Sequence, residues 1–272
     1  HHIVLLLSQN SQRCIGATDI RDSIMIASLP MYARPELDEV HTHLWASIRT
    51  NLERTGIKAP ETLSQDADLM ATWMDPALVL SQACGMPYRK FLHGKVKLVG
   101  TPVYDLENCP PGHYRSAIVV RRNDPGSTLT DFAQARFAYN EDNSQSGMAA
   151  PLIHAATQGV RFSNRIQSHS HVVSASMVSD NLADIASLDA VSWKLMDRHD
   201  GFSKRLRLLE WTSPTTPVLP FITSVNQNVD QIFAAIERAI EELSPEERDT
   251  ICLKGIVKIP AEEYLKVPNP QM

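Results

Sequence analysis

The sequence has no excess of basic residues, no long apolar run and none of the motifs of the common enzyme classes. Its 272 residues carry 26 Lys and Arg against 31 Asp and Glu, a net charge of −5, so the basic footprint of a nucleic-acid-binding protein is missing. The apolar run at residues 3–7 is five residues long, whereas a membrane-spanning helix needs about 20. The G-x-S-x-G, P-loop and G-x-G-x-x-G motifs are absent, which argues against three large enzyme classes.

Cysteine is scarce, and none of the four cysteines, Cys14, Cys84, Cys109 and Cys252, forms a C-x-x-C pair. A structural zinc site is therefore not expected. Cys84 and Cys109 each stand beside turn-forming residues, so in an oxidising compartment they are candidates for a disulfide. The alternative for the pair is two buried thiols.

Histidine pairs do not make a convincing metal site either. His41 and His43 lie two residues apart on a predicted helix and therefore point to different sides. The second pair, His169 and His171, has no evident third ligand. We expect no metal and no cofactor.

The first 22 residues do not form a complete secretory leader, because no charged region precedes the apolar run at 3–7. His1 and His2 have the character of a tag and are left out of the fold prediction. A leader already removed and a natural start further along the chain both remain open, so the sequence alone allows a periplasmic or a cytoplasmic location.

Strand and helix patterns alternate in two successive groups. The first predicts strands at 23–29, 68–73 and 96–100, with helices at 40–56 and 76–82 between them. The second predicts strands at 116–121, 136–139, 161–167, 183–188 and 205–211, with helices at 129–135, 151–158, 171–178 and 191–198. After three prolines, a strand at 221–224, a helix at 229–243 and a capped helix from Ser244 return to the α/β pattern. This order predicts two α/β lobes joined by at least two crossovers, with a ligand cleft at the carboxyl ends of the strands.

The stretch from Phe137 to Gly147 is the most informative for chemistry. A predicted strand ends there, the polar loop Ser144-Gln145-Ser146-Gly147 follows, and Pro151 fits the first turn of the next helix. Such a loop presents backbone N–H groups and serine hydroxyls at the positive end of a helix dipole, which suits a tetrahedral oxyanion. A plain helix N-cap is the alternative.

Three further sets of residues are candidates for ligand contacts. His171, in Ser168-His169-Ser170-His171, precedes another helix and is able to donate to the same anion. Asp189 follows a strand and would orient a protonated ligand group or an amine, or merely cap the next helix. The aromatic residues Tyr32, Trp73, Tyr104 and Tyr114 would cover a ligand, although core packing is their usual role.

Taken in order, these segments resemble the substrate-binding proteins of phosphate, phosphite and phosphonate ABC transporters. The resemblance runs from about residue 23 to the end and rests on an ordered set of segments, namely 81–85, 114–120, 144–147 with Pro151, 168–171, 183–193 and 219–223. It implies a periplasmic-binding-protein type 2 fold with two lobes, each a mixed sheet flanked by helices, and a hinge of two crossovers. The corresponding division is residues 23–114 with 214–272 for the first lobe and 115–213 for the second.

The resemblance also implies a function and a set of ligand contacts. The protein would be a non-enzymatic, monomeric, exported solute-binding component that captures a small oxyanion or phosphonate by hinge closure and delivers it to a permease. The implied binders are Ser144, Gln145, Ser146, Gly147 and His171, with Asp189, Tyr32 and Trp73 as further candidates. Two alternatives stay open: a sensor domain for a signalling partner, and a precursor-synthesis enzyme on the same fold with Cys84 or His171 as its reactive group.

Overall fold

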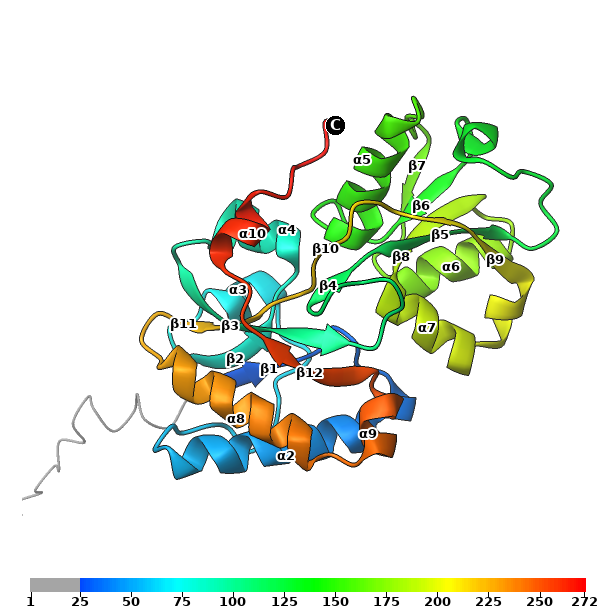
Figure 1. The fold of residues 1–272 in the computed structure, drawn as a ribbon. Coiled ribbons are helices and arrows are strands. Elements are labelled where there is room, and N and C mark those ends of the chain that lie inside the picture. The colour runs from blue at the N-terminus through cyan, green and yellow to red at the C-terminus, as the bar shows by residue number, and fades with distance from the viewer. Residues whose placement is uncertain (1–24) are drawn as a thin grey trace, which may run out of the picture.

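The computed structural model describes residues 25–272, which form two lobes side by side (Figure 1). The predictions made on residues 1–22, including the leader and Cys14, lie outside the described residues. Each lobe is built on a five-stranded mixed sheet, as the resemblance implied. The first sheet has the order β1-β2-β11-β3-β12, with bounds Ile26–Ser28, Leu78–Gln82, Phe221–Ser224, Val96–Tyr104 and Leu253–Val257. The second has the order β7-β6-β8-β5-β9, with bounds Arg165–Gln167, Phe137–Tyr139, Ile185–Asp189, Ser116–Arg121 and Leu206–Trp211.

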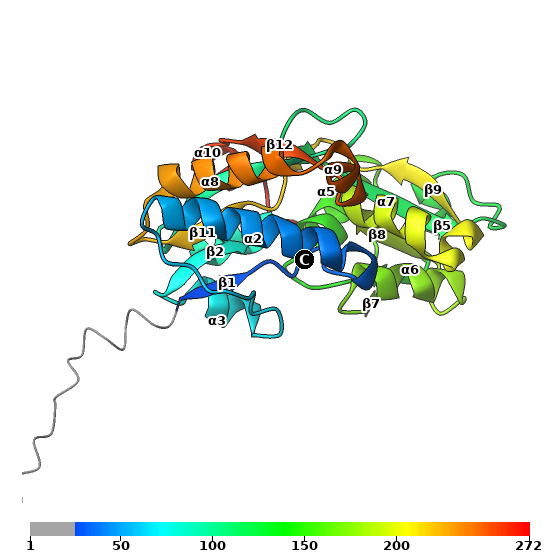
Figure 2. The same cartoon turned by 90° about the horizontal axis from the view of Figure 1, so that it is seen from below.

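Helices cover both sheets. Those of the first lobe are η1 (Pro35–Leu37), α2 (Asp38–Arg54), α3 (Leu69–Trp73), α4 (Gly85–Pro87), η2 (Tyr88–Leu92), α8 (Val229–Glu242), α9 (Pro245–Thr250) and α10 (Ala261–Leu265). Those of the second lobe are η3 (Leu129–Phe132), η4 (Gln145–Ala149), α5 (Ala150–Thr157), α6 (His171–Ser179), α7 (Ala190–His199) and η5 (Gly201–Arg205). Helices α2 and α8 lie side by side along the first lobe, as Figure 2 shows from below.

The core of the second lobe follows from the two-residue period of its strands. On β5, Ala117 and Val119 face a cluster that includes α6 and α7 side chains. Ile118 and Val120, between them, face a second cluster with Phe137, Phe162 and Ala155 of α5. One strand thus holds helices on both faces of the sheet, which fixes the positions of the helix N-termini at the sheet's edge.

The chain passes between the lobes at two places. It leaves the first lobe after β4 (His113–Tyr114) and returns through β10 (Thr216–Pro217), and these two short strands pair antiparallel. The strands of the first sheet come from residues 26–104 and 221–257, and those of the second from 116–211. We propose the lobe division given above, 23–114 with 214–272 against 115–213; residues 23 and 24 lie outside the described residues.

Two predicted elements of the first lobe were wrong. Residues 68–73 form a helix instead of a strand, because the Asp68 carboxylate caps it by accepting from the Ala71 amide at 2.8 Å. Residues 76–82 were predicted as a helix, but Leu78–Gln82 is the strand β2, buried along its whole length between β1 and β11. A short, mostly apolar run has no periodicity that distinguishes a buried strand from a buried helix.

Candidate ligand-binding site

The polar loop at residues 144–147 lies where β6 ends and α5 begins, on the second lobe. Ser144 caps the helix, since its Oγ accepts from the Gly147 amide at 3.0 Å. Its carbonyl accepts from the amides of Met148 and Ala149 at 3.1 and 3.0 Å. The amides of Gln145 and Ser146 take no part in these hydrogen bonds. They lie at the positive end of η4, which continues directly into α5, with Pro151 in the first turn of α5. The N-cap is therefore confirmed, and anion binding by the same loop stays a prediction.

The loop is fixed in place by two strands of its own sheet. The Ser146 carbonyl accepts a hydrogen bond from Ser116 Oγ of β5 at 2.9 Å and another from Ser187 Oγ of β8 at 2.8 Å. All three serines are buried. Both lone pairs of this carbonyl are thereby satisfied, which sets the orientation of the Ser146 residue before any ligand arrives.

Three predicted binders meet directly beside the loop. Ser146 Oγ and His171 Nε2 are hydrogen-bonded at 2.9 Å, and His171 Nε2 lies 3.4 Å from Asp189 Oδ2. His171 is the first residue of α6, so its ring stands at a second helix N-terminus that faces the loop. Its Nδ1 is buried without a hydrogen-bond partner among the described residues. Burial lowers the pKa of His171, and Asp189 opposes that shift, so the ring is neutral at neutral pH.

Asp189 caps α7 and also contacts His171, which is bonded to Ser146. We call Ser146, His171 and Asp189 the polar cluster. Its Oδ1 accepts from the Ser192 amide at 2.9 Å and its Oδ2 from Ser192 Oγ at 2.6 Å. Across the lobe boundary, Tyr32 Oη donates to Asp189 Oδ1 at 3.2 Å. Because Asp189 accepts from both lobes and contacts His171, it connects the first lobe to the loop at residues 144–147, which we call the binding loop.

Tyrosine hydroxyls from the first lobe and the crossover complete the cluster. Tyr32 and Tyr104 pack edge to face with ring centroids 5.3 Å apart, and they line a narrow cavity together with Gln82. The Tyr114 hydroxyl is buried without a hydrogen-bond partner among residues 25–272. Burial, with a smaller contribution from Asp189, raises the pKa of Tyr32 and of Tyr114 well above the usual value. Both hydroxyls therefore keep their protons and act as donors.

The structure brings together most, but not all, of the residues predicted to bind. Trp73 lies in the first-lobe core with Leu78 and Tyr264, and its indole donates to Ser81 Oγ at 3.2 Å, so it takes the core-packing alternative. His171 joins the cluster, whereas His169 is exposed and lies 3.3 Å from Glu141.

The candidate Cys84–Cys109 disulfide is not formed: both residues are free thiols, which is the alternative that the sequence left open. Cys84 is the residue before α4, and its sulfur faces the backbone amide of Gln145. Cys109 lies in the turn before β4, in a groove with Arg115 and Trp211. The two side chains thus sit in different surroundings. Burial raises the pKa of each thiol, so neither is an activated nucleophile.

Sequence reasoning missed residues that act through tertiary contacts. Ser116 and Ser187 hold the Ser146 carbonyl, and Gln82 donates to the Leu219 carbonyl and Tyr104 Oη, both at 3.1 Å. Arg89 donates from Nη1 to Gln145 Oε1 at 2.7 Å. Ser116 and Ser187 lie near the ends of predicted strands, where binding sites form, so the sequence held a weak signal for both. No sequence feature indicated Arg89.

A salt bridge at the lobe boundary holds the two lobes together. Arg34 donates from Nη2 and Nη1 to the two carboxylate oxygens of Asp200 at 2.8 and 3.1 Å. Both side chains are less than one-fifth exposed. On its own lobe, Arg34 also pairs with the exposed carboxylate of Glu36 at 2.8 Å.

We expect Asp200→Asn to weaken ligand binding about threefold to tenfold, since a partly buried, two-point ion pair of this kind contributes about 1 kcal/mol to the closed arrangement. Calorimetric titration measures the change. Glu36→Gln is the matched control, because it removes the other partner of Arg34 and leaves the contact between lobes intact. Equal affinity in Asp200→Asn and the unmodified protein would show that this pair does not stabilise closure.

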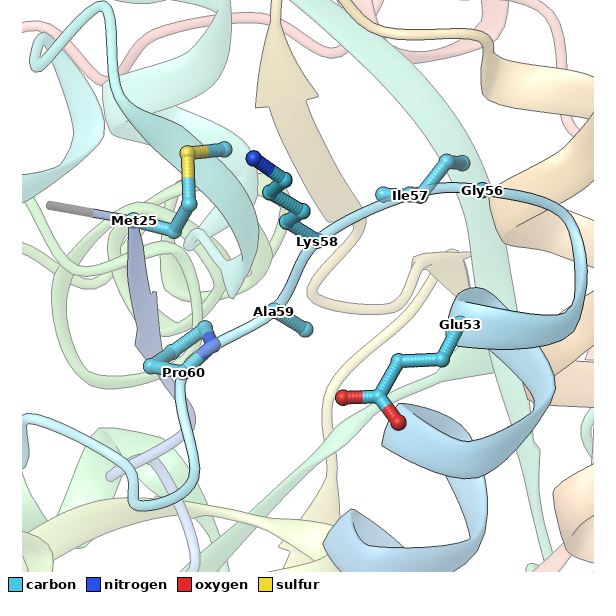
Figure 3. Close-up of a pocket in the computed structure, with 7 residues that line it drawn as sticks. All are labelled: Met25, Glu53, Gly56, Ile57, Lys58, Ala59 and Pro60. Carbon is cyan, nitrogen blue, oxygen red and sulfur yellow. The ribbon is translucent and has the colours of Figure 1, made fainter. Parts of the chain in front are cut away.

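A larger hollow of about 560 Å³ lies at the far end of the first lobe (Figure 3). It is lined by Met25, Glu53, Gly56, Ile57, Lys58, Ala59 and Pro60. It opens at the start of β1, whereas the polar cluster lies beyond the opposite end of that strand. Within residues 25–272, no set of three or more His, Cys, Asp or Glu side chains is placed to hold a metal ion. In the same residues, no helix is long and apolar enough to cross a membrane.

Two mixed α/β lobes, a two-strand hinge and a polar cluster at helix N-termini between the lobes define a periplasmic-binding-protein type 2 fold. The family model "ABC transporter, phosphonate, periplasmic substrate-binding protein" matches residues 79–262. The chain therefore belongs to the phosphonate family of ABC-transporter periplasmic substrate-binding proteins. Proteins of this family bind phosphonates, work with ABC-transporter permeases and are generally not enzymes.

Solved structures agree with this fold at low sequence identity. PhnD1 from Prochlorococcus marinus, in complex with methylphosphonate, has a TM-score of 0.69 at 14% identity, covering 89% of this chain and 95% of its own. A binding protein of an ABC phosphonate transporter from Pseudomonas aeruginosa has a TM-score of 0.66 at 13% identity, with 88% and 82% covered. XAC2383 from Xanthomonas citri, bound to ATP, has a TM-score of 0.65 at 13% identity, with 90% and 94% covered. No curated protein matches the sequence.

Proposed function

We propose that this protein captures a small phosphorus oxyanion (phosphate, phosphite or an organophosphonate) between its lobes, in the periplasm, and delivers it as a monomer to an ABC-importer permease. The observation that carries the proposal is the convergence of Ser146, His171, Asp189 and the Tyr32 hydroxyl at the N-termini of three helices, η4, α6 and α7. Hydroxyls, a neutral imidazole and backbone amides are donors that bind an anion strongly when water is excluded.

The contacts within the cluster are ones that a ligand is able to replace. The hydrogen bond between Ser146 and His171, and the contact between His171 and Asp189, occupy side chains from three elements of the second lobe. Oxyanion oxygens would take over the Ser146, His171 and Gln145-amide positions. Tyr32 and Tyr114 would then cover the ligand from the first-lobe side.

Asp189 gives the site its selectivity under this proposal. A buried carboxylate repels a fully ionised anion but accepts a hydrogen bond from a P–OH group. A singly protonated phosphate or phosphonate has that proton, whereas sulfate at neutral pH has none. An aminoalkyl group would also satisfy Asp189. Tyr32, Tyr104 and Gln82 line the adjoining narrow cavity, which suits a short organic substituent.

A thermal-shift screen is the direct test of the ligand class. The panel contains phosphate, phosphite, methylphosphonate, 2-aminoethylphosphonate and sulfate, because a ligand that binds only the native state raises the melting temperature. We expect a shift with at least one phosphorus oxyanion and none with sulfate. No shift with any phosphorus oxyanion would refute the proposed ligand class.

Ser146→Ala is the matching test of the site. Removing a hydroxyl that donates to a charged ligand costs about 1.5–3 kcal/mol, which corresponds to a roughly 10- to 100-fold weaker affinity. Calorimetric titration with the ligand identified in the screen measures this loss. The melting temperature of the free variant should stay close to that of the unmodified protein. Ser163→Ala, a change at an exposed serine outside the cluster, is the control and should leave the affinity unchanged.

A further inference from the structure

The guanidinium of Arg89 joins three separate parts of the molecule. Arg89 lies in η2 of the first lobe. Its Nη1 donates to Gln145 Oε1 of the second-lobe binding loop at 2.7 Å. Its Nε donates to Asn269 Oδ1 at 2.8 Å, and its Nη2 to the Pro268 carbonyl at 3.3 Å. Each nitrogen of the guanidinium thus has its own acceptor.

The two remaining acceptors belong to a segment that also reaches the second lobe. After α10, residues 268–271 line a groove together with Leu152 and Ala156 of α5 and with Phe162. Figure 1 shows this segment, in red, leaving the first lobe and running toward α5. We call residues 268–271 the strap. Arg89 therefore holds the strap and the binding loop at once, and both lie against the second lobe.

The Gln145 end of this contact is buried and adjoins the other candidate binders. Gln145 is 2% exposed, and a charge-assisted hydrogen bond to a buried acceptor is stronger than one between neutral groups. Burial lowers the pKa of Arg89, while Cys84 and Tyr114 oppose the shift; an arginine nonetheless keeps its charge. The residue after Gln145 is Ser146, the centre of the polar cluster.

We propose that Arg89 is a positioning residue for ligand binding, and that it couples lobe closure to the shape of the binding loop. The bond to Gln145 exists only when the lobes are together, so the loop gains this support on closure. The strap keeps the guanidinium aimed at the loop through Asn269 and Pro268. This inference rests on the proposed function for its ligand, but the coupling to closure is measurable without one.

Binding measurements test the role with two Arg89 variants and a matched control. Calorimetric titrations with methylphosphonate and with inorganic phosphate compare the unmodified protein with Arg89→Gln, Arg89→Lys and Lys90→Gln. We expect at least a tenfold loss of affinity in both Arg89 variants, because a lysine lacks the planar three-nitrogen fork. Lys90 is the neighbouring exposed cation, and its hydrogen bond to Asn143 Oδ1 at 2.8 Å also crosses the lobe boundary. Because an exposed charged contact of this kind contributes little, its variant should stay within twofold.

A double-mutant cycle separates positioning from general structural damage. In the Gln145→Ala background, Arg89→Gln should cause little further loss, because the acceptor it acts through has gone. Asn269→Ala should cause a smaller loss of the same kind. Full affinity in Arg89→Lys, or independent and additive losses in the cycle, would overturn the proposal.

Lobe closure is measured separately by small-angle X-ray scattering and by the distance between spin labels on Ser163 and Glu237, one on each lobe. The Arg89→Gln protein without ligand should populate more open conformations than the unmodified protein or Lys90→Gln. Identical distance distributions would refute the coupling whatever ligand binds. If the unmodified protein binds neither probe but the Arg89→Gln variant is more open, the proposed ligand is refuted and the coupling is supported.

Discussion

Gly147→Ala is expected to abolish most ligand binding and to lower the stability of the second lobe. A Cβ on this residue would lie 1.9 Å from Asn140 Oδ1, 3.0 Å from Asn140 Cγ and 3.2 Å from Ser144 Oγ. The Asn140 backbone is held, because its carbonyl accepts from the His169 amide at 2.9 Å, so the side chain, whose buried Oδ1 has no hydrogen-bond partner among the described residues, has to rotate away. The methyl group would also press on the hydroxyl that caps the helix.

The expected size of this effect follows from overpacking and from loss of the cap. Overpacking a tight site costs about 1–3 kcal/mol, and loss of a cap costs about 1 kcal/mol. A displaced 144–147 loop no longer presents its amides and hydroxyls together, so we expect a roughly hundredfold or greater loss of affinity. Calorimetric titration and urea unfolding measure the two effects.

Gly201→Ala is the matched control for this change. No atom lies within 4 Å of the position that its Cβ would take, so affinity and stability should remain unchanged. A Gly147→Ala protein that binds as tightly as the unmodified one would show that the loop does not hold the ligand.

Acidification between pH 7 and pH 5 is expected to destabilise the protein, and His171→Gln is expected to reduce this effect. Burial holds the pKa of His171 below its ordinary value, which is about 6.5 in an unfolded chain. The unfolded chain therefore takes up a proton first as the pH falls. The stability contributed by the neutral ring is complete above about pH 6.5 and is lost as the pH falls toward the folded-state pKa.

Urea unfolding at several pH values measures this dependence. Burial lowers the pKa of His41 as well, so His171→Gln should remove part of the slope and His41→Gln another part. His169→Gln is the control, because that side chain is exposed and pairs only with Glu141 at the surface. An unchanged slope in His171→Gln would contradict a neutral, buried ring. In the same variant, affinity should fall roughly 10- to 100-fold, the effect of losing one hydrogen bond to a charged ligand.

The fold and the local structure around the central candidate residues were predictable because their signals are local. The strand, polar loop and helix around Gly147 depend on neighbouring residues, and the cap formed by Ser144 follows from residue type and spacing. His171 likewise stands directly after its own cap, Ser170. Features of this kind are encoded within a few residues.

The parts that failed depend on contacts between distant segments. The predictions of a helix at 76–82 and a strand at 68–73 were wrong because short apolar runs have no decisive period. Residues 78–82 form a strand because they are buried between β1 and β11. Trp73 ends a predicted strand and Tyr32 follows one, but only Tyr32 points toward Asp189. Arg89 and Gln145 are 56 residues apart, so no sequence pattern connects them.

The paired acids around Arg34 have a consequence for how quickly a ligand leaves. When the lobes separate, Arg34 loses Asp200 but keeps Glu36, which lies two residues along its own chain. Neither charge is stranded in an apolar setting, because Asp200 becomes solvated as the lobes part. Opening therefore loses the roughly 1 kcal/mol of this contact and carries no further cost from an unpaired buried charge. A binding protein has to hold its ligand and then release it. An ion pair between the lobes whose arginine keeps a second partner, Glu36, opposes opening without preventing it.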